Sequence, residues 1–266
     1  MIPLRTQFAL APYFRIVRAA VVLRWSVAQL AMAILLAPAI GHAGPPYTTD
    51  DPEPVPFRHW EIYLATQHSV TRDGAFGAAP FVDVNYGALP GVQLHVMGQL
   101  AYARPNGGST SYGAGDTELG AKVRLLNEAK WWPMMSLYPQ FDFPTGAAAH
   151  RLGTGRLHVF IPLWVQKSAG PWTTFGGGGF WINPGARNRD YWYVGWEVQR
   201  RVSDFATIGA EIFYTTPDQV GGDANLRFNL GFVLDLTEHH HLLFSAGRSV
   251  VGDSLFQGYA AYQLTL

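Results

Sequence analysis

Charged residues at even spacing are the side chains of this sequence with the clearest capacity for chemistry. Glu118, Lys122 and Arg124 are separated by even numbers of positions, so they share one face of an extended strand. By the same reasoning we predict four more charged residues on inward positions: Asp142, Glu197, Glu211 and Arg227. Rings of charged side chains select solutes in pores, so this set is a candidate charge-lined constriction. The alternative is that the charges pair across neighbouring strands and stabilise the wall. Both interpretations stay open, and both can hold at once.

An acidic, proline-rich segment is the second candidate. Residues 44–56 contain five prolines and three acids, Asp50, Asp51 and Glu53. Proline excludes both regular helix and central strand here, so the segment is an extended or looped leader. We hypothesise that this periplasmic leader folds back beside Lys122 and Arg124 as a plug, or docks an envelope partner. The alternative is a disordered tail.

Metal binding and catalysis have weaker support. His239-His240-His241 offers imidazole ligands, but in a tight turn three consecutive side chains diverge instead of converging on one ion. His95 and His158 are interpreted as lone wall residues. No Gly-x-Ser-x-Gly elbow is present, although Ser245 lies near the histidine triplet. We therefore expect no enzyme, no metal site and no cofactor.

The elements that must position these residues follow from the hydrophobic pattern. From Leu226 to Leu236 every second residue is apolar, and the residues between them include Arg227 and Asn229. This alternation predicts a strand with one apolar and one polar face. Twelve such strands are predicted, at 57–70, 78–88, 91–103, 115–126, 133–143, 156–167, 172–183, 190–201, 205–216, 225–236, 240–250 and 255–266. Ten or fourteen strands stay possible, because the pattern at 172–183 and 240–250 is weak. Pro139 and Pro162 fall inside two of these strands, so each should lie at a bulge or a strand end.

Alternation alone fits two kinds of barrel. A soluble lipocalin-like barrel turns its apolar face inward, whereas an outer-membrane barrel presents that face to lipid. Twelve strands enclose a space too wide for side chains alone to fill, which favours the membrane. Aromatic residues near strand ends, as expected of an interfacial girdle, favour it too: Trp60, Trp131, Trp132, Tyr191 and Trp192.

Connection lengths give an independent test of the topology. The third and fifth connections, 104–114 and 144–155, are long, whereas 89–90, 202–204 and 237–239 are short turns. Outer-membrane barrels have long outer loops and short periplasmic turns. Both chain ends of the barrel are therefore expected on the periplasmic side.

Composition and the N-terminus indicate an exported chain. The 266 residues have no cysteine, zero formal net charge and 14% charged residues, which gives no electrostatic case for nucleic-acid binding. Residues 1–43 read as a signal peptide: an arginine-containing start, an apolar run over 25–40, and a cleavage site at Gly41-His42-Ala43. A retained membrane anchor is the alternative, although the apolar run is short for a span.

Three segments are similar to one known family. They are residues 44–55 followed by Arg58-His59-Trp60-Glu61, residues 115–126, and the corner Phe143-Pro144-Thr145-Gly146. The sequence resembles the proteins of the MetA pathway of phenol degradation, often labelled simply transporters, over nearly all of the mature chain. The resemblance implies an outer-membrane barrel that admits aromatic or other apolar compounds. It supplies no catalytic residues.

These observations together predict an all-β protein: one closed antiparallel transmembrane barrel of about twelve strands over 57–266, after a cleaved signal peptide (1–43) and a leader (44–56). The expected location is the outer membrane of a Gram-negative-type bacterium, and the expected partners are membrane lipid, the barrel-assembly machinery and a small-molecule solute. No ATP motif is visible, so solutes would flow passively. The alternatives are an outer-membrane hydrolase for lipid or peptide, and a purely structural barrel.

Overall fold

Alternating polarity gives strands in this chain because successive side chains of a strand point to opposite faces. The computed structural model describes residues 46–266, which are antiparallel strands apart from loops and one short 3-10 helix. In this range no helix is long and apolar enough to cross a membrane. The predicted signal peptide, residues 1–43, lies outside the described residues.

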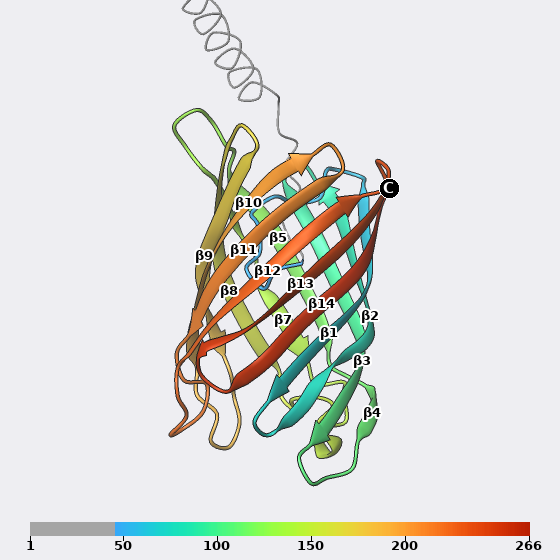
Figure 1. Ribbon diagram of the computed structural model, residues 1–266, viewed down its shortest axis with the longest axis vertical. Coiled ribbons are helices and arrows are strands. Elements are labelled where there is room, and N and C mark those ends of the chain that lie inside the picture. Colours follow the sequence, from blue (N-terminus) through green and yellow to red (C-terminus); the bar gives the residue numbers. More distant parts are fainter. Residues whose placement is uncertain (1–45) are drawn as a thin grey trace, which may run out of the picture.

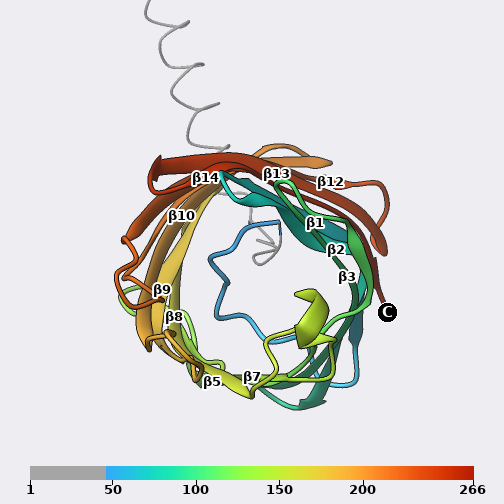
Figure 2. The ribbon, with the colours of Figure 1, turned by 90° about the horizontal axis from the view of Figure 1, so that it is seen from below.

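The strands form one continuous sheet (Figure 1). They are β1 Trp60–Thr71, β2 Gly74–Leu89, β3 Val92–Pro105, β4 Ser111–Ala114, β5 Thr117–Leu126, β6 Met134–Leu137, β7 Gln140–Phe143, β8 His158–Ala169, β9 Trp172–Ile182, β10 Tyr191–Ser203, β11 Ala206–Thr215, β12 Asn225–Asp235, β13 His240–Val251 and β14 Ser254–Thr265. β1 pairs with β2 on one side and with β14 on the other, which closes the sheet into a barrel. Figure 2 shows the resulting ring of strands.

Two wall segments are interrupted, so fourteen strands make twelve crossings. β4 and β5 both pair with β3, and β6 and β7 both pair with β5 and β8. The predicted closed antiparallel barrel of twelve strands is confirmed, and the alternatives of ten or fourteen crossings are wrong. Two predictions are corrected. The strand predicted at 115–126 begins at Thr117, and residues 111–114, predicted as part of a connection, form β4 on the other side of a break at Gly115-Asp116. The strand predicted at 133–143 is broken at Tyr138-Pro139.

The two prolines questioned above lie beside each other. Tyr138 N donates to Pro162 O at 3.1 Å, so Pro162 borders the break next to Pro139. Pro139 lies at the break, as predicted, whereas Pro162 stays inside β8 opposite Gly179. A central strand tolerates Pro162 because the neighbouring wall segment is irregular at this level and needs no regular ladder bond from it.

The apolar face of the barrel points outward. Leu230 is 60% exposed, Val194 54% and Ile208 51%, whereas Glu197 is fully buried and Glu211 is 3% exposed on the inner face. This orientation contradicts the soluble alternative, in which charged residues would face water outside. In an outer-membrane barrel, lipid contacts the apolar outer face of the strands.

The two ends of the barrel differ in their connections. Short turns join β2 to β3, β8 to β9 and β10 to β11 at the end that holds Leu266. At the other end the segment 144–157 folds back inside the barrel and contains η1 Ala148–His150 (Figure 2). Leu152 of this inward loop packs against Ala101 and Ala103 of β3. The loop therefore narrows the mouth opposite the chain ends.

Candidate functional site

The leader, whose residues 46–56 are described, runs through the barrel interior (Figure 2). The backbone N–H groups of Thr48 and Thr49 donate to the two carboxylate oxygens of Glu211 on β11, at 2.9 and 2.8 Å. On β3, Gln93 Oε1 accepts the N–H of Val55 at 2.9 Å. Inward side chains thus satisfy backbone donors of a segment that has no strand partner.

Two serines fix carbonyl groups of the same leader. Ser245 Oγ on β13 donates to Pro46 O at 2.6 Å, and Ser136 Oγ on β6 donates to Pro52 O. With β3 and β11, these contacts come from strands on different sides of the ring. The leader is therefore tied to the wall around the lumen.

Inward glycines make room for the leader. A Cβ at Gly209 would lie 2.5 Å from Tyr47 Oη, and one at Gly231 would lie 2.9 Å from the Tyr47 ring. A Cβ at Gly195 would meet the hydroxyl of Thr49. We call Gly195, Gly209 and Gly231 of β10, β11 and β12 the glycine track. Glycine inside a strand often marks close approach of another backbone, a signal that the sequence analysis did not use.

Lys122 on β5 is the cation that faces the leader. Its Nζ lies 3.2 Å from Asp50 Oδ1 and 3.8 Å from Asp51 Oδ1. Its own side chain is 5% exposed, and that of Asp51 is 3% exposed. Burial raises the pKa of Asp51 well above its usual range, while the nearby Lys122 ammonium opposes the shift. Asp51 also accepts the N–H of Glu53 at 2.5 Å. Asp51 therefore fixes the backbone of the leader in addition to contributing a charge.

Glu118 on β5 belongs to a second charged group. His95 lies between two carboxylates, with Nδ1 3.0 Å from Asp83 and Nε2 3.0 Å from Glu118. Gln140 Nε2 donates to Glu118 Oε1 at 2.8 Å. Asp142 is the cross-strand partner of Glu118, so two acids stand side by side on the inner wall. His95, interpreted from sequence as a lone wall residue, is instead the link between two acids.

The other predicted charged residues occupy separate places. Glu197 and Glu211 are cross-strand partners on β10 and β11. Both carboxylate oxygens of Glu197 lack a hydrogen-bond partner within residues 46–266. The Arg227 guanidinium lies 5.9 Å from the centre of the Phe213 ring, and Arg124 lies against the Gly91 turn. Across the described chain no ion pair joins two of the seven predicted residues. The structure therefore brings Lys122 to the leader acids and distributes the remainder along the lumen.

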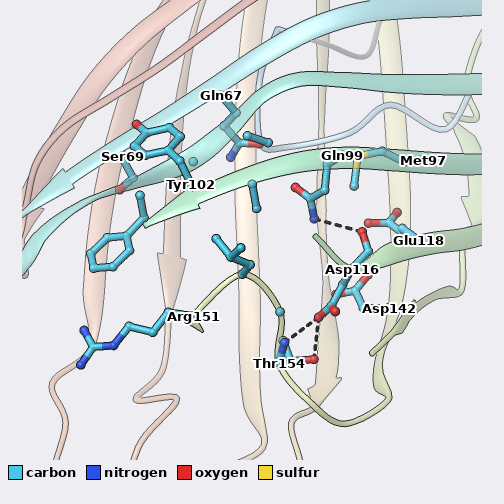
Figure 3. A pocket seen from close by; sticks show the side chains of 16 residues that line it. Gln67, Ser69, Met97, Gln99, Tyr102, Asp116, Glu118, Asp142, Arg151 and Thr154 are labelled. Atoms are coloured by element: carbon cyan, nitrogen blue, oxygen red, sulfur yellow. Dashed lines mark hydrogen bonds between the residues drawn. The ribbon is translucent and has the colours of Figure 1, made fainter. Parts of the chain in front are cut away.

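Asp116 anchors the inward loop at the first break in the wall (Figure 3). Its carboxylate accepts the N–H of Gly146 at 2.9 Å, the N–H of Thr154 at 2.7 Å and the hydroxyl of Thr154 at 2.8 Å. A cavity of about 440 Å³, here called the outer cavity, lies between this loop and the wall. Arg151 of the loop lines it, as do Glu118 and Asp142. Because Asp116 lies at the break and not inside a strand, its side chain can bind the inward loop.

Aromatic side chains fill part of the interior, which the sequence analysis missed. The inner cluster comprises Tyr138, Phe160, Trp164, Tyr193 and Phe213. Gly177 and Gly179 of β9 leave room for two of these rings, since a Cβ would lie 3.0 Å from Trp164 and 2.7 Å from Phe160. The weak hydrophobic pattern at 172–183 has this cause: small residues on β9 accommodate large ones on β8.

The histidine triplet does not converge. His240 Nδ1 lies 2.5 Å from Tyr262 Oη and is exposed, whereas His241 Nδ1 lies 2.7 Å from Asp235 and is buried. Within residues 46–266 no group of three or more His, Cys, Asp or Glu side chains is arranged to hold a metal ion. Ser245 contacts the leader and not the triplet.

A solved structure of an outer membrane channel has the same architecture. An outer membrane channel from Pseudomonas putida F1 superposes with a TM-score of 0.65 at 17% identity, covering 81% of this chain and 98% of that one. The translocator domain of the autotransporter NalP from Neisseria meningitidis gives a TM-score of 0.45 at 10% identity, with 77% and 87% covered. No family model and no curated protein matches the chain, so the resemblance to phenol-degradation transporters stays a prediction. The chain has the fold of an outer-membrane barrel.

Proposed function

We propose that this chain is an outer-membrane channel for the passive passage of small molecules, and that its own leader narrows the lumen. The observation that carries the proposal is a closed barrel with an apolar exterior, whose interior holds the leader and two cavities lined by both charged and apolar side chains. The similar structure from Pseudomonas putida F1 is an outer membrane channel, which supports the same role here.

The interior suits small solutes that carry apolar rings. The inner cluster of aromatic side chains offers apolar surface inside the lumen, beside the charged groups on β3 and β5. This pairing supports aromatic or other apolar compounds among the solutes. The outer membrane of a Gram-negative-type bacterium is the location that the lipid-facing exterior favours, with the barrel-assembly machinery inserting the chain there.

Liposome swelling tests the channel. Liposomes that contain the mature protein are mixed with sugars, amino acids or aromatic acids, and solute entry is followed by light scattering. We expect entry of small solutes. Impermeability accompanied by lipid or peptide hydrolysis would instead support an outer-membrane enzyme, and impermeability alone would leave a structural barrel.

Deleting residues 45–55 tests the leader. We expect single-channel conductance to rise, because the deletion removes backbone that lies between Glu211 and Gln93 inside the barrel. A deletion of residues 107–109, in the loop between β3 and β4, is the matched control and should leave the lumen unchanged. Equal conductance of the 45–55 deletion and the full chain would rule out a plug.

A further inference from the structure

Two cavities inside the barrel share part of their lining, and the leader lines one of them. The outer cavity, about 440 Å³, extends from the inward loop to three residues of the wall, Gln67, Met97 and Glu118 (Figure 3). An inner cavity of about 430 Å³ is lined by the same three residues and continues to Pro56 and Thr265, near the chain ends of the barrel. The residues that line the two cavities together reach from the inward loop to the end of the barrel that holds Leu266.

We propose that solutes cross through these joined cavities, between the leader and strands β1, β2, β3 and β5, and that the route prefers small organic ammonium ions to carboxylates. This inference rests on the proposed channel function. The level at which the two cavities meet is called the junction, and Gln67, Met97 and Glu118 form it.

The junction combines a fixed charge with a movable side chain. Glu118 is the cross-strand partner of Met97, so the two side chains face the lumen at one level. Gln140 and His95 hold the Glu118 carboxylate in place, at 2.8 and 3.0 Å. Methionine is unbranched and flexible, so Met97 can adjust the width. A solute at this level passes a positioned carboxylate.

Carboxylates predominate on both sides of the junction. The outer cavity is lined by Asp116, Glu118 and Asp142 against the single cation Arg151. The inner cavity adds Asp50, Asp51, Glu53, Glu61 and Asp83 against Lys122 and His95. Lys122 is already paired with the leader acids Asp50 and Asp51. Clefts lined by one sign of charge concentrate ions of the other sign.

Aromatic rings line the inner cavity together with these acids. Tyr63, Phe81, Tyr138, Phe160, Trp164 and Tyr259 line it. The Lys122 ammonium already lies 4.9 Å from the centre of the Tyr138 ring, within the range of a cation–π contact. An organic ammonium ion that carries an aromatic ring is attracted both by the acids and by the aromatic side chains. An aromatic carboxylate is attracted only by the aromatic side chains.

Reversal potentials in planar bilayers under a KCl gradient test the charge. We expect the full mature chain to favour K⁺ over Cl⁻. E118Q should lower that ratio about tenfold, because one charge roughly 6 Å from the ion in water changes the K⁺ and Cl⁻ permeabilities about threefold each, in opposite directions. E118K should lower it further. The matched control is E238Q, in an exposed turn, which should leave the ratio unchanged. Heat-dependent gel migration verifies that each variant is folded.

Two adjacent substitutions test the position of the route. M97W should reduce conductance because Met97 lines the junction, whereas V96W should not, because Val96 is 42% exposed on the outer face. Equal conductance of M97W and the unmodified chain would place the route elsewhere and overturn the inference.

Liposome swelling with phenethylamine and with phenylacetate compares two solutes of the same aromatic body. Faster entry of the amine, slowed in E118Q, supports the inference. Conductance with equal entry of both, or with no effect of E118Q, overturns the inference and leaves the channel proposal standing. A folded chain with neither conductance nor entry overturns the channel proposal itself.

Discussion

Lys122 is the residue on which the charge balance of the leader depends. It is buried, and among the described ion pairs it is the partner of both Asp50 and Asp51. Removing one member of a buried pair leaves uncompensated charge, which typically costs roughly 3 kcal/mol or more. The same reasoning explains why an acidic, proline-rich segment resides inside a barrel at all.

Substituting Lys122→Met should therefore release the leader. We expect hydrogen exchange of the amides of residues 46–56 to accelerate strongly, while the barrel strands keep their protection. Lys167→Met is the matched control, since Lys167 is 39% exposed and pairs with Glu128 away from the leader. Unaltered protection of the leader in Lys122→Met would show that the hydrogen bonds alone hold it.

Acidity should strengthen leader docking through Asp51. Burial raises the pKa of Asp51, opposed by Lys122, and Asp50, Glu53 and Glu197 also face it. An acid whose pKa is raised on docking takes up a proton, so docking is favoured below the raised pKa and weakens as pH rises from the ordinary value of about 3.9 towards it.

The measurement is the protection factor of the leader amides against pH. Protection should fall from mildly acidic to mildly alkaline solution in the full chain. Asp51→Asn keeps a neutral, isosteric group and should flatten this dependence. An equally steep dependence in Asp51→Asn would assign it to another group.

At the scale of strands, the glycine track controls how closely the leader approaches the wall. Gly209→Val should displace Tyr47, because a Cβ there would lie 2.5 Å from the Tyr47 hydroxyl. We expect larger conductance with the barrel intact. Ala210→Val, one position along on the outward face, is the control and should conduct like the full chain. Conductance that is the same in both variants would contradict a role for the track.

The strands themselves were predictable from sequence, and their breaks were not. Lipid imposes a strict period of two on the outer face, so Leu226 to Leu236 already indicates a strand and its orientation. The break at Asp116 depends on a loop thirty to forty residues ahead, at Gly146 and Thr154. The pattern of residues within one strand does not reveal a contact with a distant loop.

At the scale of the molecule, the apolar side chains face outward and the charged ones inward, the reverse of a soluble domain. Leu230→Arg places a charge on the lipid face at the middle of β12, and should destabilise the barrel by about 2–4 kcal/mol if that level is the bilayer midplane. Ser69→Arg adds the same side chain to the outer cavity and should cost much less. Urea unfolding in vesicles compares the two. Similar losses would argue against a lipid-facing exterior.

The contents of the lumen were only partly predictable. The sequence indicated inward charges and a leader suited to them, because alternation assigns faces and proline excludes a strand. It did not indicate that Lys122 would meet the leader while Glu118 would meet His95, since strand register decides which inward residues are neighbours. Nor did it indicate that aromatic residues such as Trp164 would fill part of the lumen.

The span of chain between the leader and its contacts dictates an order of assembly. Pro46 meets Ser245 across 199 positions, and Thr49 meets Glu211 across 162. We expect these contacts to form only once β11 and β13 have joined the ring that β14 closes against β1. The leader precedes every strand in the sequence, yet we expect it to dock last. This order would make the closed barrel with an unoccupied lumen an intermediate of folding.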